Sequence, residues 1–138
     1  MNRSSQREAI LEVLRACKSH PTADELYAML RSRMPRLSLA TVYRNLEQLA
    51  NAGIVLALDG AGARRFDGNI VPHYHKRCSS CGCVSDLPDT DFESLDGIIS
   101  AILPKIECDS CSIEFAGTCD KCNTKKPEYN NVSGRQQN

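Results

Sequence analysis

The chain has 138 residues, and its 17 basic and 17 acidic side chains give a formal net charge of zero. It contains no Trp, three Phe and four Tyr, so we expect largely aliphatic cores in one compact domain or two small ones. The polar start, MNRSSQREAI, lacks the apolar core of a signal peptide, and the longest apolar run, IVLAL at 54–58, is too short to span a bilayer. These features exclude a membrane protein and predict a soluble, cytoplasmic one.

The charged side chains are unevenly distributed along the chain. Residues 1–66 hold ten Lys or Arg and six Asp or Glu, a net charge of +4, whereas residues 67–138 hold seven and eleven, a net charge of −4. A basic front half can meet nucleic acid even when the total is neutral, although many solvated helices carry such an excess.

Three helices are predicted in the first half, within 3–17, 19–35 and 38–53, from apolar residues at helical spacing. The expected caps are Ser4 or Ser5 for the first helix, Thr22 with Glu25 as a capping box for the second, and Ser38 with the C-terminal Gly53 for the third. The expected inward residues are Ile10, Leu11, Val13 and Leu14, then Leu26, Met29 and Leu30, then Leu39, Val42, Leu46 and Leu49.

The outward face of the third helix carries polar side chains that can reach phosphates and base edges of DNA. These are Thr41, Tyr43, Arg44, Asn45 and Gln48. Beyond Gly53 the pattern predicts a strand at 54–58, a turn at 59–62 and a returning strand at 63–67. Three helices and a two-stranded wing make a winged helix-turn-helix. DNA binding is favoured over an ordinary helical domain whose third helix only packs.

The second half is predicted to be a small α/β unit. It contains a strand at 83–87, an amphipathic helix within 91–103, and one or two short strands within 106–117. The apolar stripe of the helix consists of Phe92, Leu95, Ile98, Ile99 and Ile102. Such a small unit exposes apolar surface on its own, which favours a role in dimerisation.

Eight cysteines are present, and in a reducing compartment paired Cys-x-x-Cys motifs indicate zinc or redox chemistry over disulfides. Cys78 with Cys81 and Cys119 with Cys122 supply four thiolates, which suit a closed tetrahedral zinc site. The zinc would join the start of the second unit to its end and contribute on the order of 10 kcal/mol to folding. Redox-active or idle thiols are the alternative.

Four cysteines lie outside these two pairs. Cys17 and Cys83 are expected in a buried, small apolar role. Cys108 and Cys111 form a third Cys-x-x-Cys pair, which could compete for zinc or form a disulfide.

Together these patterns predict an α+β fold. An N-terminal winged helix-turn-helix is expected over 1–68, a small zinc-stapled α/β dimerisation domain over 69–122, and a polar, disordered tail over 123–138.

The three histidines of the chain are His20, His73 and His75. An isolated histidine such as His20 is most often a surface or hydrogen-bonded residue. His73 and His75 are better candidates for metal binding, because alternate residues of a strand point the same way. Asp67 and Asp86 lie nearby in sequence and offer oxygen ligands.

Several strings, from about Arg3 to Cys122, resemble the ferric-uptake-regulator family. They are HPTADELY (20–27), LATVYRNLEQLANAGIV (39–55), RRFDG (64–68), PHYHKRCSSCG (72–82) and GTCDKC (117–122). The sequence is most similar to the family's peroxide-responsive branch. Asp86, where an iron-uptake repressor more often carries Glu, favours that branch, and so does Asp67.

The resemblance implies a dimeric, metal-dependent transcriptional repressor and not an enzyme. Its third helix would enter the major groove of an A·T-rich inverted repeat in double-stranded DNA, with Tyr43 and Arg44 in contact and Thr41 and Asn45 beside them. The implied ligands are Cys78, Cys81, Cys119 and Cys122 for structural Zn²⁺, and His20, Asp67, His73, His75 and Asp86 for regulatory Fe²⁺ or Mn²⁺.

A mixed set of three imidazoles and two carboxylates suits Fe²⁺ or Mn²⁺. His20 belongs to the DNA-binding half, so a metal that joins it to His73 would fix the angle between the domains. Coupling of this kind is typically about 1–3 kcal/mol. In the peroxide-responsive branch, bound Fe²⁺ reacts with hydrogen peroxide and a ligand histidine is oxidised, at positions that match His20 and His73. The metal is then lost and the repressor leaves DNA.

The sequence departs from the family's pattern in two places. Members usually carry another stretch of helix before the segment that starts at Arg3, and we expect its absence to weaken DNA contacts or to change how the metal site closes. Many members also carry histidines of an additional site where this chain has Ser110 and Cys111, so that site is expected to be absent or altered. The pair Cys108 and Cys111 leaves a thiol-based response open.

Other functions stay in competition. Within the family, the alternative is an iron- or manganese-responsive uptake regulator without peroxide chemistry. A Cys-x-x-Cys oxidoreductase is disfavoured because no such pair follows a βαβ pattern. A metal hydrolase is disfavoured because five protein ligands leave little room for substrate. A zinc-stapled interaction module would show no salt-dependent DNA binding.

Overall fold

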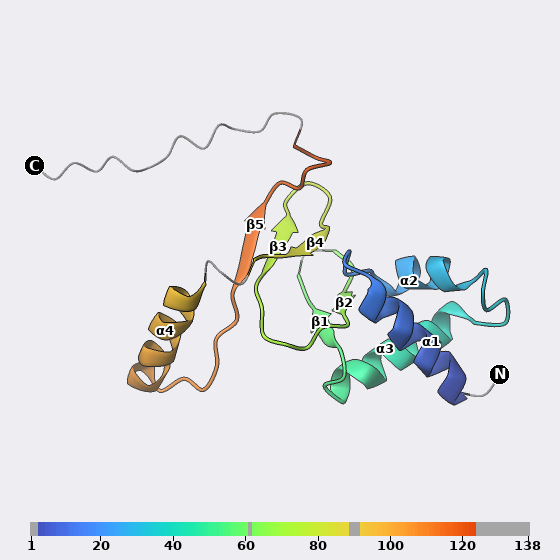
Figure 1. Ribbon diagram of the computed structural model, residues 1–138, viewed down its shortest axis with the longest axis horizontal. Coiled ribbons are helices and arrows are strands. Elements are labelled where there is room, and N and C mark those ends of the chain that lie inside the picture. Colours follow the sequence, from blue (N-terminus) through green and yellow to red (C-terminus); the bar gives the residue numbers. More distant parts are fainter. Residues whose placement is uncertain (1–2, 61, 89–91, 124–138) are drawn as a thin grey trace, which may run out of the picture.

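The computed structural model describes residues 3–60, 62–88 and 92–123 and has the predicted α+β architecture (Figure 1). The elements are α1 (Arg3–Ala16), α2 (Ala23–Leu30), α3 (Leu39–Asn51), β1 (Leu56–Leu58), β2 (Arg65–Asp67), β3 (His75–Cys78), β4 (Val84–Asp86), α4 (Glu93–Ile102), the 3₁₀ turn η2 (Leu103–Ile106) and β5 (Glu114–Gly117). Apart from residue 123, the predicted tail lies outside the described residues. No described helix is long and apolar enough to cross a membrane.

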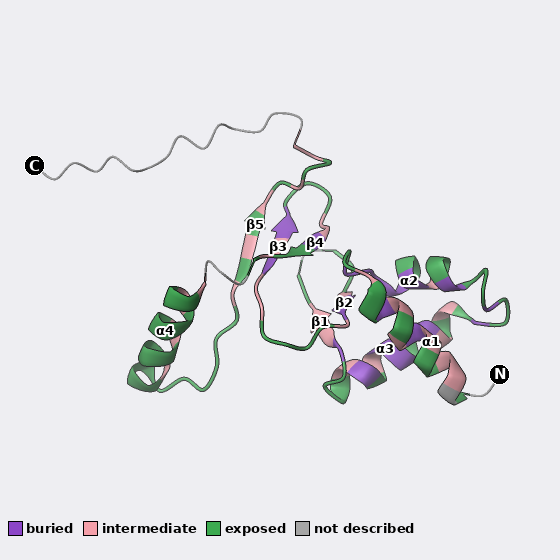
Figure 2. Cartoon of the chain, in the orientation of Figure 1, coloured by how far each residue is buried: buried purple, intermediate pink, exposed green. Residues whose placement is uncertain are grey.

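The first three helices surround an aliphatic core that also receives residues from the wing. The buried apolar side chains are Ile10, Leu14, Ala23, Leu26, Leu30, Met34, Leu37, Val42, Leu46, Leu49, Val55 and Phe66. Figure 2 shows that the buried part of the chain is concentrated in this half. Met29 was predicted to face inward, but it is 43% exposed. In this eight-residue helix, Leu26 and Leu30 make a narrow core stripe, and Met29 falls at its edge.

The helix ends follow local sequence signals, with one exception. Thr22 accepts a hydrogen bond from the Glu25 N–H, and the Glu25 carboxylate accepts one from the Thr22 N–H, which confirms the capping box. Ser38 caps α3, and Gly53, at φ +71°, follows the last helical turn in the left-handed conformation. The predicted N-caps Ser4 and Ser5 are wrong, because both lie inside α1, which already begins at Arg3.

The wing is an antiparallel pair of short strands, β1 and β2, in which Ala57 pairs with Phe66. Both strands are shorter than predicted. The first begins late because Val55 belongs to the helical core. The Phe66 N–H donates to the Pro21 carbonyl, and Thr22 forms an isolated bridge with Arg65. The wing is thereby fixed to the segment that precedes α2.

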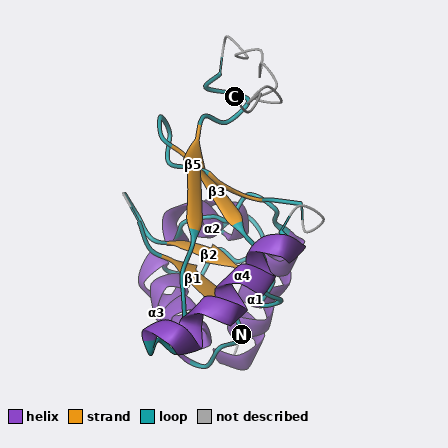
Figure 3. Cartoon of the chain, turned by 90° about the vertical axis from the view of Figure 1, so that its left-hand side faces the viewer, coloured by secondary structure: helices purple, strands orange, loops and turns teal. Residues whose placement is uncertain are grey.

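The second half contains a three-stranded sheet in the order β4-β3-β5, antiparallel between β3 and β4 and parallel between β3 and β5. The predicted strand at 83–87 is β4, and 106–117 contains one strand, β5. Figure 3 shows β3 and β5 of this sheet above the wing strands β1 and β2, which lie among the helices in that view. The side chain of Arg77, on β3, crosses to β5, where its Nε donates to Glu114 Oε1 at 2.8 Å.

The last helix, α4, has little contact with the rest of the chain (Figure 1). No residue of this described helix is buried, and Ile98 and Ile102 of the predicted stripe are 56% and 44% exposed. Its start is held to the sheet by an aromatic cluster, in which Phe92 lies 4.7 Å from Tyr74 and 5.4 Å from Phe115 between ring centroids. The apolar face of α4 is therefore unpartnered among the described residues of the chain.

Candidate metal centres

Three histidines and two aspartates converge where the winged helix meets the second sheet. Each residue offers one donor atom, and these atoms all lie within 4.8 Å of one another. The residues are His20 before α2, Asp67 at the end of β2, His73 before β3, His75 at the start of β3 and Asp86 at the end of β4. The structure thus brings together all five residues of the expected regulatory site. His73 was expected on a strand, but it lies in the preceding loop.

All three imidazoles present Nε2 to the same two carboxylate oxygens. The Oδ2 atom of Asp67 lies 2.8, 3.0 and 3.4 Å from the Nε2 atoms of His73, His75 and His20. The Oδ1 atom of Asp86 lies 2.9, 3.3 and 2.7 Å from the same three atoms. Nitrogen and oxygen donors that face one another in this way form a cage suited to a divalent cation.

Local backbone structure holds these donors in place. His20 is 1% exposed and has φ +49°, a left-handed conformation that is uncommon for a residue with a Cβ. Its carbonyl accepts a hydrogen bond from Arg65 Nη1 at 3.1 Å, which fixes the strained residue against the wing. The Nδ1–H of His73 donates to the Val71 carbonyl, which orients that ring and directs Nε2 into the cluster.

Electrostatics at this cluster favour bound positive charge. Burial alone raises the pKa of Asp67, but hydrogen bonds from His75 and the Asn69 N–H, with the nearby His20, lower it to about 2. Burial lowers the pKa of His73, yet its hydrogen bonds to Val71 and Asp67 leave that pKa above the usual value. An ionised carboxylate among imidazoles that attract protons will also attract a metal cation.

The cluster spans the boundary between the two halves, and two arginines reinforce the connection. The Nε of Arg65, in the wing, donates to the Gly82 carbonyl at 3.1 Å. The Nη2 of Arg77, in the second sheet, donates to the Asp59 carbonyl at 3.2 Å. The halves therefore touch through polar contacts, and the metal-ligand set lies at their boundary.

A second cluster consists of cysteines at the end of the β3–β4 hairpin. The sulfur atoms of Cys78, Cys81, Cys83 and Cys119 all lie within 4.8 Å of one another, and those of Cys81 and Cys119 are 3.7 Å apart. The Cys122 thiol contacts the thiols of Cys119, Cys81 and Cys78. Three of the expected zinc ligands, Cys78, Cys81 and Cys119, thus gather at one place with Cys83, whereas Cys122 lies outside the set of sulfurs that are all within 4.8 Å of one another.

The cysteine cluster already favours thiolates at two positions. Backbone N–H groups of Cys81 and Cys119 direct hydrogen bonds at Cys78 and lower the pKa of its thiol to about 5. The Cys122 N–H similarly lowers the pKa of Cys119. The pKa of Cys83 rises to about 12, first because its thiol hydrogen-bonds to Cys81. A donor set of thiolates and thiols at this spacing fits Zn²⁺.

The cysteines outside the expected zinc pairs differ from the prediction in part. Cys83 was expected as a buried apolar residue, but it is half-buried and lies among the candidate ligands. Cys17 is also half-buried, and its Sγ is 2.9 Å from the Ser19 hydroxyl. Cys108 and Cys111 are both exposed.

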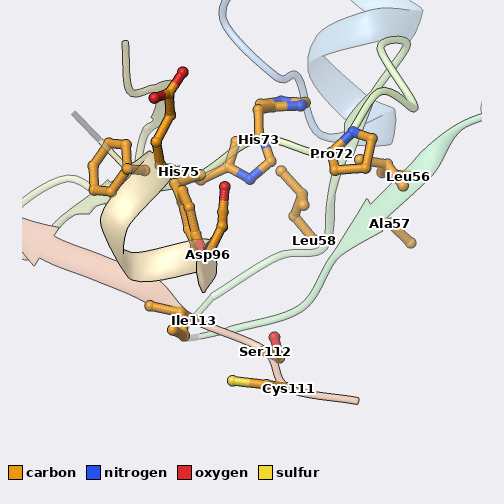
Figure 4. Close-up of a pocket in the computed structure, with 13 residues that line it drawn as sticks. Leu56, Ala57, Leu58, Pro72, His73, His75, Asp96, Cys111, Ser112 and Ile113 are labelled. Atoms are coloured by element: carbon orange, nitrogen blue, oxygen red, sulfur yellow. Dashed lines mark hydrogen bonds between the residues drawn. The ribbon is translucent and has the colours of Figure 1, made fainter. Parts of the chain in front are cut away.

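A cleft of about 540 Å³ opens beside the histidine cluster (Figure 4). Its walls come from β1, the segment that carries His73 and His75, the first turn of α4, and the segment before β5 with Cys111. Within the described part of the chain, only the two clusters above bring three or more potential ligands together, and Cys111 belongs to neither. The altered additional site therefore stays a prediction.

The third helix exposes only part of its predicted DNA-contacting face. Tyr43 and Arg44 are exposed and Thr41 is half-buried. Asn45 was expected to point outward, but it is 6% exposed, donates to the Thr41 carbonyl and accepts from Arg7 Nε. Its position, three residues after Val42, lies at the edge of the core stripe, where α1 covers it. Asn45 thus connects α3 to α1 in this chain, and its contact with DNA stays a prediction.

The sequence model of the ferric uptake regulator family matches residues 1–115. The chain belongs to this family. Family members bind DNA as dimers and are metal-dependent transcriptional regulators, not enzymes. The predicted family and fold class are therefore confirmed, and the two clusters give this Fur-family regulator a Cys₄ site and a His/Asp site.

This chain is 36% identical over 124 residues to the peroxide operon regulator of Bacillus subtilis. The match covers 88% of this chain and 83% of that protein. It is 35% identical over 121 residues to the peroxide-responsive repressor PerR of Staphylococcus aureus, covering 87% and 81%.

Two solved structures are also similar to this Fur-family chain. The Campylobacter jejuni peroxide stress regulator has a TM-score of 0.73 at 31% identity, covering 87% of this chain and 90% of that one. The Vibrio cholerae ferric uptake regulator has a TM-score of 0.66 at 33% identity, covering 82% and 88%.

Proposed function

We propose that this protein is a dimeric, metal-dependent repressor that senses hydrogen peroxide and then releases an A·T-rich inverted repeat in cytoplasmic DNA. The observation that carries the proposal is the His/Asp cluster, in which His20 and Asp67 from the winged helix face His73, His75 and Asp86. The similarity to the peroxide regulators of B. subtilis and S. aureus supports the choice of signal.

The cysteine cluster would stabilise the fold, and the His/Asp cluster would respond to the signal. Cys78 and Cys81 would hold a structural Zn²⁺ together with Cys119 and Cys122, which connects the β3–β4 hairpin to the segment after β5. Four thiolates leave no open coordination position, so this site contributes folding energy and no chemistry. We assign the zinc-stapled unit to residues 69–122 and the winged helix to 1–68.

The regulatory site would hold Fe²⁺ or Mn²⁺ through its three Nε2 atoms and two carboxylates. Bound Fe²⁺ would supply the electron that activates hydrogen peroxide for addition of oxygen to a nearby imidazole. The chain's own residues determine which imidazole is exposed to that chemistry. His20 and His73 lie closest to Asp86 Oδ1, at 2.7 and 2.9 Å, and this carboxylate is the more exposed of the two.

The same residues couple the site to DNA. Oxidation of one imidazole would remove it as a metal ligand, so the metal would no longer connect His20 to His73. The halves would then be joined only by contacts such as the hydrogen bond from Arg65 to the Gly82 carbonyl. The winged helix would then change its orientation relative to the dimerisation domain. Tyr43 and Arg44 lie on the exposed face of α3, where the Arg44 guanidinium can reach phosphate or guanine.

The test begins with the purified full chain loaded anaerobically with Fe²⁺ and treated with slightly more than one equivalent of hydrogen peroxide. Peptide mass spectrometry should find one added oxygen on the peptide that carries His20 or His73, together with loss of binding to an A·T-rich duplex pool. A Mn²⁺-loaded sample is the control and should stay unmodified and bound.

A matched variant separates imidazole chemistry from thiol chemistry. Cys108→Ser combined with Cys111→Ser removes the exposed pair and leaves both clusters intact. This variant should respond to peroxide like the parent chain. Oxidation confined to Cys108 and Cys111, with unmodified histidines and bound iron, would overturn the proposal in favour of a thiol response.

A second candidate is an iron- or manganese-responsive uptake regulator without peroxide chemistry. The observation in its favour is the similarity to the V. cholerae ferric uptake regulator, which is 33% identical to this chain. It predicts metal-dependent DNA binding that peroxide leaves unchanged, with unmodified histidines under the same treatment.

A further inference from the structure

The cysteine cluster holds one thiol more than a tetrahedral zinc ion can bind. Structural zinc sites are almost always four-coordinate. The sulfur atoms of Cys78, Cys81, Cys83 and Cys119 all lie within 4.8 Å of one another, and the Cys122 thiol is a fifth one beside them. One of these thiols must therefore be left out of any single coordination shell.

The hairpin places Cys83 beside Cys78 by strand register. Lys76 pairs with Ser85 and Arg77 with Val84, so the next pair along the hairpin is Cys78 with Cys83. The Cys78 N–H donates to the Cys83 carbonyl at 2.8 Å, which extends the ladder to this pair. Directly opposite residues of an antiparallel pair project to the same face, with Cβ atoms about 4.5–5.5 Å apart.

The turn of the hairpin makes this return possible. Gly82 has φ +76°, and its N–H donates to the Cys78 carbonyl at 2.9 Å, which closes the turn. A left-handed residue at this point is inexpensive for glycine. The chain therefore turns back immediately after Cys81 and brings Cys83 into the cluster.

Sulfur positions match a zinc site that includes Cys83. A Zn–S distance of about 2.3 Å gives a tetrahedron with S···S edges of about 3.8 Å. The Cys81 and Cys119 sulfurs are 3.7 Å apart, and all pairs among Cys78, Cys81, Cys83 and Cys119 lie within 4.8 Å. Cys83 thus completes a set of four without rearrangement of the backbone.

Cys122 reaches the same neighbours from a different part of the chain. Its thiol contacts those of Cys119 and Cys81, as does the thiol of Cys83. Cys122 is held by a local turn, in which its N–H donates to the Cys119 carbonyl at 3.1 Å. Cys83 is held by the sheet. The two thiols therefore approach the same coordination position from different parts of the chain, Cys83 from the hairpin and Cys122 from the turn after Cys119.

We propose that Cys83 and Cys122 are interchangeable fourth ligands of the structural zinc, with Cys78, Cys81 and Cys119 common to both arrangements. This inference rests on the zinc site of the proposed function. It gives the site a property that four cysteines alone lack: the metal stays fully thiolate-bound when either of the two thiols is blocked or replaced.

The first experiment compares zinc retention in the full chain and four serine variants after dialysis against a chelator, by elemental analysis and by X-ray absorption at the zinc edge. Cys122→Ser and Cys83→Ser should each keep one zinc with four sulfur neighbours. The double variant should lose its zinc or keep it with three sulfurs. Cys119→Ser, which removes a common ligand, should behave like the double variant.

The second experiment asks which thiol is free in the zinc-loaded parent chain. Cys83 lines a cleft of about 520 Å³ with Cys81 and Cys119, so a small alkylating reagent can reach it. Iodoacetamide followed by tandem mass spectrometry should place one label per chain, divided between Cys83 and Cys122. Cys78, Cys81 and Cys119 should be protected.

The outcomes separate this inference from the zinc site itself. A parent chain that holds no tightly bound zinc would contradict the proposed structural site. A zinc-loaded parent chain whose Cys122→Ser variant loses zinc as fully as Cys119→Ser would overturn only the exchange. Three other results would also overturn the exchange. They are an equal loss of zinc from Cys83→Ser, complete alkylation of only one of the two thiols, and a zinc with four sulfur neighbours in the double variant.

Discussion

The two halves of the molecule are stabilised in different ways. The winged helix buries twelve apolar residues in one cluster, whereas the described residues beyond 68 bury only Cys78 and Val84 among their apolar side chains. The second half also exposes Ile98, Ile102 and Ile106. The first half can therefore be stabilised by its own hydrophobic core, whereas the second half needs another source of stability, such as a bound metal or a second chain.

The difference in hydrophobic burial between the halves suggests a separate role for each of the two candidate metal clusters. The cysteine cluster lies in the half without a core, where a metal that joins hairpin and C-terminal segment can replace missing hydrophobic burial. The His/Asp cluster lies between the halves, where we expect a bound metal to affect their relative orientation more than their stability. We predict that a second copy of the chain covers the exposed apolar face of α4.

The largest expected effect comes from removal of the proposed structural zinc. In Cys119→Ser the second half should unfold while the winged helix keeps its core, because the metal contributes on the order of 10 kcal/mol to folding. Hydrogen exchange measured by mass spectrometry should show rapid exchange in β3, β4 and β5 and protected α1 and α3. Cys108→Ser, at an exposed position, is the matched control. Uniform loss of protection in both halves would contradict the division.

A smaller effect is expected in the opposite half. Leu46 is fully buried in the winged-helix core, so Leu46→Ala should lower the free energy of unfolding of that half by about 2–5 kcal/mol. Zinc content should stay unchanged, because Leu46 contacts neither cluster. Met29→Ala, on an exposed side chain of α2, should change stability by less than about 0.5 kcal/mol. Chemical denaturation with a zinc assay on the same samples checks both halves.

The third prediction concerns the exposed face of α4. Ile98→Asp places a charge on a side chain that is 56% exposed in one chain, so the fold of that chain should tolerate it. If this face covers a second copy, the dimer should dissociate at least about tenfold more readily, since a buried unpaired charge costs several kcal/mol. Analytical ultracentrifugation measures the change, with Glu93→Gln on the same helix as the control. An unchanged dimer constant would exclude this face.

Local sequence signals predicted the three helices of the first half and two of their N-caps. The capping box of Thr22 with Glu25 and the cap at Ser38 depend on residues within one helical turn, and both are confirmed. The prediction that Asn45 points outward was wrong, because its burial depends on Arg7, which lies 38 positions away in α1. The periodicity of α3 alone contains no information about that contact.

The second half was harder to predict because its contacts are non-local. The spacing of Cys83 did not reveal its role, since that role depends on the register of β3 with β4. The hairpin signal was present, however: Gly82 lies between Cys81 and Cys83 in a four-residue turn that would bring Cys83 opposite Cys78. The apolar stripe of α4 was read correctly as amphipathic, but a stripe does not say whether its partner lies in the same chain.

We propose that a metal at the His/Asp cluster couples the orientation of the winged helix to DNA binding. The most direct test measures Mn²⁺ affinity of the zinc-loaded chain with and without saturating operator DNA, and DNA affinity with and without Mn²⁺. Because coupling is reciprocal, both affinities should rise by the same factor, about 5–150-fold. A Mn²⁺ affinity that DNA leaves unchanged would contradict the account, however tightly the metal binds.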